Sequence, residues 1–271
     1  MGLYEASSEM STRASILTAL ASMLGVSQML ASSTADSPSP LFKYKESMLS
    51  LFVSAIKTPS TAQQGSKGLH QLILSIKLEQ EELKFVIHSL VKALLESQKA
   101  DEELIQETLA VLQTLSKLSP SSVEDVALLP LFSLLPDKPP REDEIEVRTK
   151  CVDALAALET ICVQQQLFFR LVVHLFTKVE LLVLTQREGE VDTMIAYAHA
   201  LLKTIHSALL RKSDRGDVDI PKYLERFIPR LYFLFFDALG RDGISWGENY
   251  KILISDAADI IELVVASSKV E

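Results

Sequence analysis

Apolar and small residues recur along this chain in a helical register that repeats about every 43 residues. Four stretches, starting at 61, 104, 147 and 191, carry such residues at offsets 0, +4, +8 and +11. The set is Thr61, Gly65, Leu69 and Leu72; Leu104, Thr108, Leu112 and Leu115; Val147, Cys151, Leu155 and Leu158; Val191, Ile195, His199 and Leu202. These offsets follow one face of an α-helix, and a period of this length is typical of stacked helical repeats. The pattern therefore predicts an all-α solenoid built from antiparallel helix pairs.

Prolines, glycines and capping residues divide the chain into a leading segment and a run of paired helices. Residues 1–40 are expected to hold one helix and a Ser/Pro-rich linker at 31–40, and residues 41–271 to form the solenoid, with about five helix pairs. The expected helices are 12–30, 41–57, 60–76, 79–97, 101–118, 122–135, 143–163, 164–185, 189–211, 219–239 and 246–267, with a loop at 136–144. Ser60 is expected to cap the helix that follows it, and Pro130 to kink or shorten its helix.

The composition fits a folded protein that binds other proteins. Hydrophobic residues make up 48% of the chain and charged residues 23%, with only 9 glycines and 10 prolines. The formal net charge is −9, whereas binding to nucleic-acid phosphates relies on a basic surface. We therefore expect protein partners and no direct contact with nucleic acid.

The chain shows no sign of a membrane span or a signal peptide. The longest apolar run, 167–184, contains Arg170, His174 and Lys178 at intervals of four, which places a polar stripe on a mostly buried helix. The N-terminus has Glu5 and Glu9 and lacks a basic segment ahead of an apolar core.

The two cysteines are expected to be free thiols. Cys151 and Cys162 are 11 positions apart in one expected helix, which separates them by about 16 Å along its axis. A disulfide cannot span that distance, so a reducing compartment is the default. Cys151 occupies a small-residue position of the register and is expected to be buried and inert.

The histidines do not form a metal-binding pattern. They are His70, His88, His174, His199 and His206. The last two are seven positions apart, about 10 Å along a helix, which is too far for a shared metal ion. All five are expected to be packed in the core or to lie on the surface.

Other short motifs have structural explanations. The run 65–68, Gly-Ser-Lys-Gly, lacks the preceding strand and the spacing of a Walker motif, so Gly65 and Gly68 are expected to allow close contact between helices. The acidic clusters at 79–82 and 142–146 lie at helix starts, where solvated negative charge is favourable. No catalytic, cofactor-binding or metal-binding residue is predicted.

The densest aromatic group lies near the C-terminal end of the chain. It comprises Tyr223, Phe227, Tyr232, Phe233, Phe235 and Phe236. Phe227, Leu231, Leu234 and Ala238 fit a core stripe, whereas Phe233 and Phe236 fall on a different face. This helix is either buried all round, which we favour, or offers an apolar patch to a partner.

One helix resembles a known repeat unit. The run from Asp143 to Leu158 has acidic residues, then Val147-Arg148, then small and leucine positions. This order resembles the second helix of a HEAT repeat. The resemblance implies a HEAT/armadillo-like α-solenoid, in which antiparallel helix pairs stack into a superhelix.

A longer stretch is similar to one HEAT-repeat family. The stretch begins at Leu41-Phe42-Lys43-Tyr44-Lys45 and continues through Thr58-Pro59-Ser60 and Gly68-Leu69 to the Val147-Arg148 helix. It is similar to an internal segment of the methyl-methanesulfonate-sensitivity protein nineteen (MMS nineteen) family of the cytosolic iron–sulfur assembly (CIA) targeting complex. The similarity covers residues 41 to about 180 and extends more weakly to 271.

The resemblance implies a function in DNA repair and the response to DNA damage. Members of the family are non-catalytic scaffolds of the nucleus and cytoplasm that recruit apo forms of iron–sulfur helicases, polymerases and primase to the assembly complex. The inner-face residues of the second helices would then carry protein binding, without a cofactor, a small-molecule substrate or a membrane. Two alternatives share the solenoid pattern: a transport or trafficking adaptor of the HEAT/armadillo type, and a helical enzyme whose site is assembled across helices.

Overall fold

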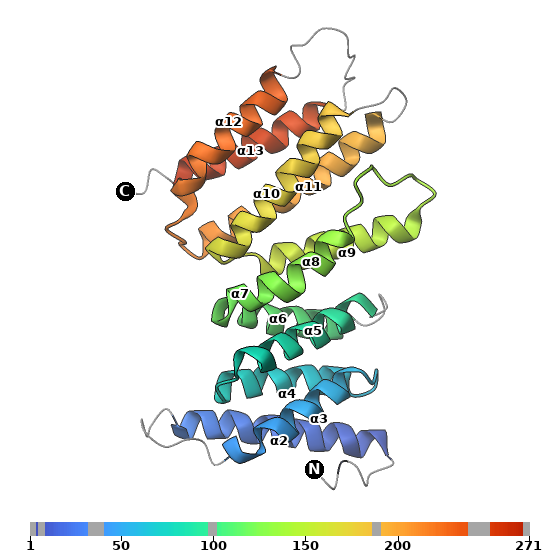
Figure 1. Cartoon of the computed structure of the whole chain (residues 1–271), viewed down its shortest axis with the longest axis vertical. Coiled ribbons are helices and arrows are strands. Elements are labelled where there is room, and N and C mark those ends of the chain that lie inside the picture. The colour runs from blue at the N-terminus through green and yellow to red at the C-terminus, as the bar shows by residue number, and fades with distance from the viewer. Residues whose placement is uncertain are drawn as a thin grey trace. The chain divides into compact units, whose positions relative to one another are not determined.

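The computed structural model of the protein describes residues 4, 9–31, 41–96, 102–185, 191–237 and 250–267. Helices account for the regular structure of these residues, and no strand occurs among them (Figure 1). Consecutive helices pack in pairs, which confirms the predicted all-α, HEAT-like architecture. The linker expected at 31–40 lies outside the described residues, apart from Ala31.

The chain divides into two compact units, residues 1–127 and 128–271. The helices of unit 1 are α2 (Met10–Ala31), α3 (Lys45–Ile56), α4 (Ala62–Ser75), α5 (Gln80–Glu96), α6 (Glu102–Leu118) and α7 (Pro120–Val123). The second helix of each pair packs on its own first helix, α3 with α4 and α5 with α6, and α4 also packs on α6. The leading helix α2 lies against α4. The domain boundary at residue 40 stays a prediction.

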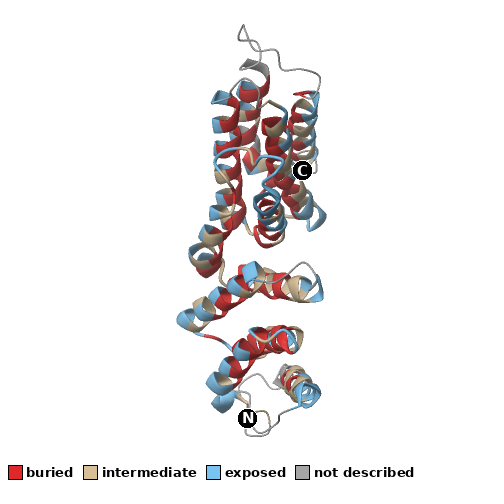
Figure 2. Cartoon of the chain, turned by 90° about the vertical axis from the view of Figure 1, so that its right-hand side faces the viewer, coloured by how far each residue is buried: buried red, intermediate tan, exposed pale blue. Residues whose placement is uncertain are grey.

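Unit 2 repeats this arrangement. Its helices are α8 (Leu129–Ser133), α9 (Ile145–Ile161), α10 (Gln165–Leu184), α11 (Val191–Asp214), α12 (Leu224–Tyr232) and α13 (Lys251–Ser267). They form the pairs α8–α9, α10–α11 and α12–α13, and α11 packs on both α9 and α13. The helix faces turned toward neighbours carry the buried residues of each unit (Figure 2).

Most of the predicted core stripe is buried. The residues at offsets +4, +8 and +11 are buried in all four stretches, except His199, which is half-buried and lies 2.7 Å from Asp256 of α13 (Nδ1 to Oδ2). The offset 0 position is wrong as a core position for Val147, which is 39% exposed. All residues from Arg141 to Arg148 are exposed, so the first turn of α9 lies outside the packed layer.

The predicted close approach at the two glycines is confirmed. A Cβ atom on Gly65 would lie 2.9 Å from both the amide nitrogen of Ile56 and the carbonyl oxygen of Phe52. A Cβ on Gly68 would overlap the ring of Phe52, which is fully buried. These two glycines therefore set how closely α4 packs on α3.

Two local predictions need correction. Thr61, and not Ser60, occupies the N-cap position of α4, and its hydroxyl donates to the carbonyl oxygen of Ala55, 3.0 Å away, instead of to the helix start. The helix expected at 122–135 is made of α7, a π-helical turn at Glu124–Leu128, and α8. Because Pro130 has no amide hydrogen and its ring crowds the preceding turn, the widened turn directly before it is the physical consequence.

The end of α11 is held by a buried lysine. Gly216 has φ of +69°, and the amides of Gly216 and Asp217 donate to the carbonyl oxygens of Ser213 and Lys212, respectively. This is a Schellman turn, which ends a helix with a left-handed glycine. The side chain of Lys212 is 1% exposed, and its Nζ lies 2.9 Å from the Val163 carbonyl oxygen and 3.1 Å from the Asp217 carboxylate.

Candidate partner-binding groove

A groove of about 240 Å³ lies between α9 and α11 in unit 2. These are the second helices of two successive pairs, where the sequence predicts the binding surface. We call it the α9/α11 groove, and its lining residues are Pro140, Glu142, Arg148, Cys151, Val152, Leu155, Asp192, Thr193, Ala196, Tyr197 and Ala200.

The groove has an apolar floor and walls with charges at its rim. Leu155 and Tyr197 are buried beneath it, whereas Val152 is 61% exposed and Ala196 is also exposed. An exposed valine and an exposed alanine on adjacent helices leave room for an apolar side chain of a partner. Charged residues around such a pocket add specificity more than affinity.

An ion pair between a buried lysine and an exposed aspartate holds the loop that closes one side of this groove. Lys178 of α10 is only 8% exposed, and its Nζ lies 2.7 Å from Oδ1 of Asp137 and 3.2 Å from the carbonyl oxygen of Pro136. The hydroxyl of Tyr197 donates to the same carbonyl oxygen at 2.8 Å. The Lys178 ammonium lowers the pKa of Asp137, mainly through their hydrogen bond. The loop carrying Pro140 is thus anchored to α10 and α11.

The thiol and the phenol at the floor of the groove are unreactive at neutral pH. Burial raises the pKa of the Cys151 thiol. Burial also raises the pKa of Tyr197. The thiol and the phenol are therefore both protonated, and neither is activated as a nucleophile. This arrangement suits binding of an apolar group.

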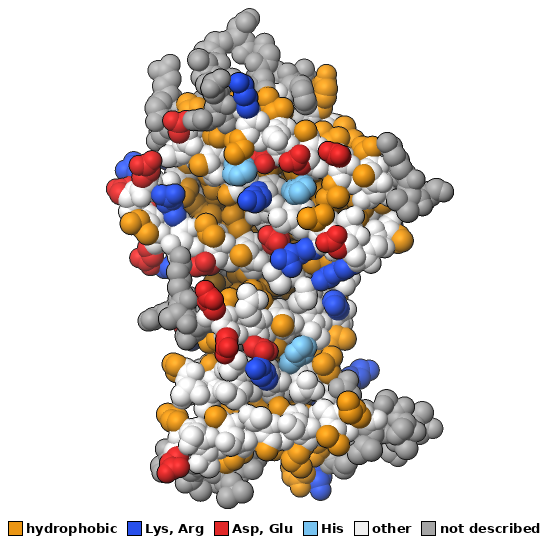
Figure 3. All heavy atoms as spheres, turned by 180° about the vertical axis from the view of Figure 1, so that it is seen from behind, with side chains coloured by type: hydrophobic (Ala, Val, Ile, Leu, Met, Phe, Trp, Pro, Cys, Tyr) orange, Lys and Arg blue, Asp and Glu red, His pale blue; other side chains and the backbone are white. Residues whose placement is uncertain are grey.

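The surface around this groove mixes charges of both signs. Figure 3 looks onto the side of the molecule that carries α9 and α11, where basic side chains lie beside acidic ones and histidines. Lys150 pairs with Glu146 at 2.6 Å, and Arg211 with Glu159 at 2.9 Å.

The two cysteines and five histidines lie in the core or at the surface of the described residues. Cys151 and Cys162 are buried and free, and burial raises the pKa of Cys162 as well. His88 is exposed, and the other four histidines are half-buried. No cluster of His, Cys, Asp and Glu able to hold a metal ion occurs among the described residues.

The aromatic group is only partly buried. Tyr223, Phe227 and Phe235 belong to the core of unit 2, where Phe227 contacts the rings of Phe168, Phe176 and Tyr223. Burial all round is wrong for this helix, because Tyr232 is 58% and Phe233 44% exposed. The side chains of Phe236 and Ala238 lie outside the described residues.

Sequence reasoning identified the helices of the groove but not its residues. Val152 and Ala196 occupy offset +5 of the 43-residue register, and Arg148 and Asp192 occupy offset +1. Equivalent positions on successive helices therefore build equivalent parts of the groove. An exposed apolar residue at the same offset in two repeats is the signal that could have revealed it.

His174 gives unit 2 a pH-dependent stability. Its ring stacks on Phe132 at 4.0 Å between centroids, and its Nε2 has no hydrogen-bond partner among the described residues. Burial lowers its pKa below 6.5, with help from Lys178 and against the charge of Asp137. As the pH falls through 6.5, His174 is therefore protonated in the unfolded chain before it is protonated in the folded chain. The free energy of unfolding decreases over this range, until the pH reaches the lower pKa that His174 has in the folded state.

We expect His174→Phe to flatten this part of the pH dependence. The variant keeps the stacking on Phe132 and removes the unpaired Nε2, so it should also stabilise the fold by about 1 kcal/mol at pH 6. Urea denaturation between pH 7.5 and pH 5 measures both effects. The control His88→Gln, at an exposed position, should leave the pH dependence of the free energy of unfolding unchanged. If His174→Phe also left this dependence unchanged, His174 would not be its source.

The C-terminal part of the chain is similar to a known protein family. Residues 154–271, from the middle of α9 to the end, match the family model MMS19_C, described as an RNAPII transcription regulator C-terminal domain. This segment is similar to the MMS19 C-terminal domain. No curated protein matches the chain.

The match confirms the family that the sequence resemblance indicated. The matched segment lies mainly in the part of the chain where that resemblance is weaker, and residues 41–153 lie outside it. The resemblance pointed to an internal segment, whereas this model describes the C-terminal part of the family. The α11 wall of the α9/α11 groove lies entirely within the matched segment. No described helix is both long and apolar enough to cross a membrane.

Proposed function

We propose that this chain is a non-catalytic adaptor of the cytosolic iron–sulfur assembly machinery. In this role it brings apo forms of iron–sulfur helicases and polymerases to the complex that inserts their clusters, in the nucleus and the cytoplasm. The cluster is cargo of the complex, and the chain contributes only protein contacts. The family match over residues 154–271 carries the proposal.

The α9/α11 groove supports this role as a contact surface. It is an apolar site with charged edges, formed where two second helices adjoin, and its buried thiol and phenol stay protonated. Solenoids bind partners through many modest contacts along such surfaces. Truncating one side chain, as in Val152→Ala, should therefore weaken binding only about two- to threefold.

Filling the groove should have a much larger effect. We expect Val152→Arg combined with Ala196→Arg to lower recovery of at least one partner by about tenfold, because two long cations would occupy the apolar space. Both positions are exposed, so the fold should remain intact. Affinity purification of the tagged chain from cells, followed by quantitative mass spectrometry, measures this effect.

A matched control uses two exposed positions on α13. Ile252→Arg combined with Ala258→Arg introduces the same two charges outside the groove and should keep the partners. Recovery of assembly factors and iron–sulfur DNA enzymes would support the proposal. Recovery of transport receptors or coat proteins would overturn it. RNA polymerase II subunits alone would favour the role that the family description names.

A further inference from the structure

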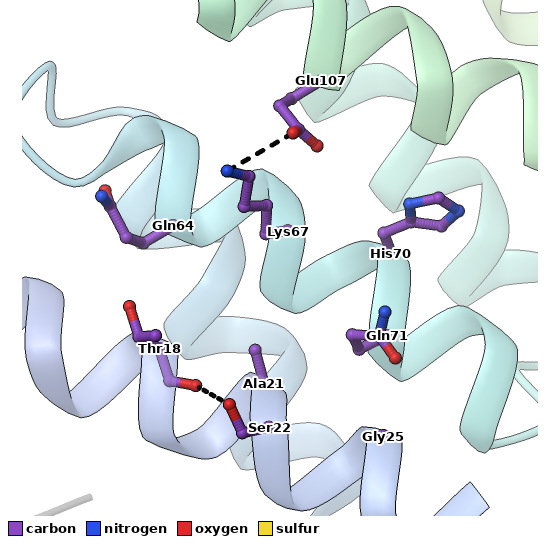
Figure 4. A pocket seen from close by; sticks show the side chains of 9 residues that line it. All are labelled: Thr18, Ala21, Ser22, Gly25, Gln64, Lys67, His70, Gln71 and Glu107. Atoms are coloured by element: carbon purple, nitrogen blue, oxygen red, sulfur yellow. Dashed lines mark hydrogen bonds and ion pairs between the residues drawn. The ribbon is translucent and has the colours of Figure 1, made fainter.

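A second groove, of about 460 Å³, lies in unit 1 between α2, α4 and α6. It is outside the segment that matches the family, so its interpretation does not depend on the proposed function. Its lining residues, all drawn in Figure 4, are Thr18, Ala21, Ser22, Gly25, Gln64, Lys67, His70, Gln71 and Glu107. They are polar or small, whereas the floor of the α9/α11 groove is apolar.

Two half-buried amides on α4 have unused hydrogen-bonding capacity. Gln64 and Gln71 make no hydrogen bond with any described residue, whereas Gln63 donates to Glu103 at 2.7 Å. Each free carboxamide offers two N–H donors and one carbonyl acceptor. A partner that both donates and accepts, such as a peptide group, satisfies them best.

The α2 wall lets a polypeptide backbone approach closely. It consists of small residues, and the hydroxyls of Thr18 and Ser22 donate to backbone oxygens of their own helix. Gly25 faces Gln71, and a Cβ added to this glycine would lie 3.3 Å from Oε1 of Gln71. The width of the groove at this end therefore depends on Gly25.

His70 adds a further acceptor. Its Nε2 lies 3.0 Å from the hydroxyl oxygen of Thr114, and that hydroxyl donates its only hydrogen to the carbonyl oxygen of Ala110. Nε2 must then be the donor, which leaves Nδ1 unprotonated and able to accept.

We propose that this groove binds an extended peptide segment of a partner in the polyproline II conformation. Gln64 and Gln71 are seven residues apart, about 10.5 Å along α4. A polyproline II chain repeats every three residues, or about 9.3 Å, and leaves its backbone N–H and C=O groups free. Peptide groups three residues apart on one face of the segment thus match the two amides.

Lys67 selects for an acidic side chain between these two contacts. It lies on the same face of α4 as Gln64 and Gln71, and its Nζ is 3.5 Å from the Glu107 carboxylate. The Lys67 side chain is 50% exposed and that of Glu107 28%, so this ion pair is weak and open to competition. The occupant is therefore an extended segment with an acidic residue between the two paired peptide groups.

The test uses the whole chain and a peptide of defined sequence. The probe is acetyl-Ala-Pro-Glu-Ala-Pro-Glu-Ala-amide, in which alanines supply peptide groups every three residues, prolines favour the extended helix, and glutamates face Lys67. Side-chain amide signals of Gln64 and Gln71 in ¹⁵N NMR spectra, assigned with single alanine variants, should shift and saturate. Gln64→Ala combined with Gln71→Ala should weaken binding about tenfold, as read from the backbone signals of α2 and α4.

Modified peptides and matched variants make the result specific. N-methylation of the central alanine should weaken binding about fivefold, because it removes one backbone donor. Gly25→Ala should weaken it by narrowing the groove, and Gln63→Ala should not. The proposal is overturned if no saturable shift occurs up to about 10 mM peptide, or if the double variant and the N-methylated peptide bind as well as the originals.

Discussion

Replacing Lys212 by methionine is expected to destabilise unit 2 by about 3–5 kcal/mol, the usual cost of removing one partner from a buried ion pair. The ammonium is 1% exposed and holds the carboxylates of Asp217 and Asp219 at 3.1 and 2.9 Å and the carbonyl oxygen of Val163 at 2.9 Å. It also lies over the ring of Phe168. Methionine fills a similar volume, so the loss would come from the oxygens that it leaves unpaired.

Asp219 makes this site a connected network. Its second carboxylate oxygen accepts a hydrogen bond from the Tyr223 hydroxyl at 2.7 Å, and Tyr223 stacks on Phe227. Lys212 therefore links the end of α11 to the segment after α9 and to the aromatic core under α12. Its loss should loosen all three.

Urea denaturation followed by far-ultraviolet circular dichroism measures the effect, and hydrogen exchange locates it. Lys203→Met, on the exposed face of the same helix, is the control and should change stability by less than about 0.5 kcal/mol. The double variant Lys212→Met/Asp219→Asn should lose less free energy of unfolding than the sum of the losses of the two single variants, because both residues belong to one network. A loss below about 1 kcal/mol for Lys212→Met would show that the network is not coupled to folding.

The helical architecture could be predicted from sequence because it depends on local patterns. The register that places Leu69, Leu112 and Leu158 in the core follows from the 3.6-residue period alone. Breaks between helices follow from residues such as Pro120, which cannot continue a helix but fits the first turn of a new one. These signals act within a few residues of one another.

The sites could not be predicted because they depend on contacts between distant segments. Lys212 meets Val163, 49 positions earlier, and Lys178 meets Asp137, 41 positions earlier. In sequence Lys178 belongs to a polar stripe on a mostly buried helix and Lys212 looks like a surface residue, and a single sequence does not show which carboxylate will lie near either lysine. The exposure of Val147 has the same origin, because a periodic pattern does not show where a neighbouring helix ends.

The second large effect is expected at the contact of α4 with α3. We expect Gly65→Ala to lower the free energy of unfolding by about 1–3 kcal/mol, because the added methyl group overpacks this contact. Alanine favours an isolated helix over glycine by about 1 kcal/mol, so a loss here would reverse the intrinsic preference. The reason is that the new methyl group meets backbone atoms of Phe52 and Ile56 at 2.9 Å, which cannot rotate away. Thermal unfolding of the variant against the parent chain measures the change.

Gly25→Ala is the matched control and should have the opposite sign. This glycine is also helical, but its new methyl group meets only the end of the flexible Gln71 side chain. The gain in helix propensity should therefore remain, at about 0.5–1 kcal/mol. If both variants were stabilised, the close packing of α4 on α3 would not constrain the fold.

Gly68→Ala separates a side-chain obstacle from a backbone one. Its methyl group would overlap the ring of Phe52, so Phe52→Leu should recover part of the stability that Gly68→Ala loses. Phe52→Leu should recover less of the stability that Gly65→Ala loses, because the methyl group of Gly65→Ala meets main-chain atoms of α3. Unequal recovery in the two double-mutant cycles, each from urea denaturation midpoints, is the expected result. Equal recovery would mean that α3 and α4 move apart as rigid bodies, in which case the two glycines would act as one spacing element.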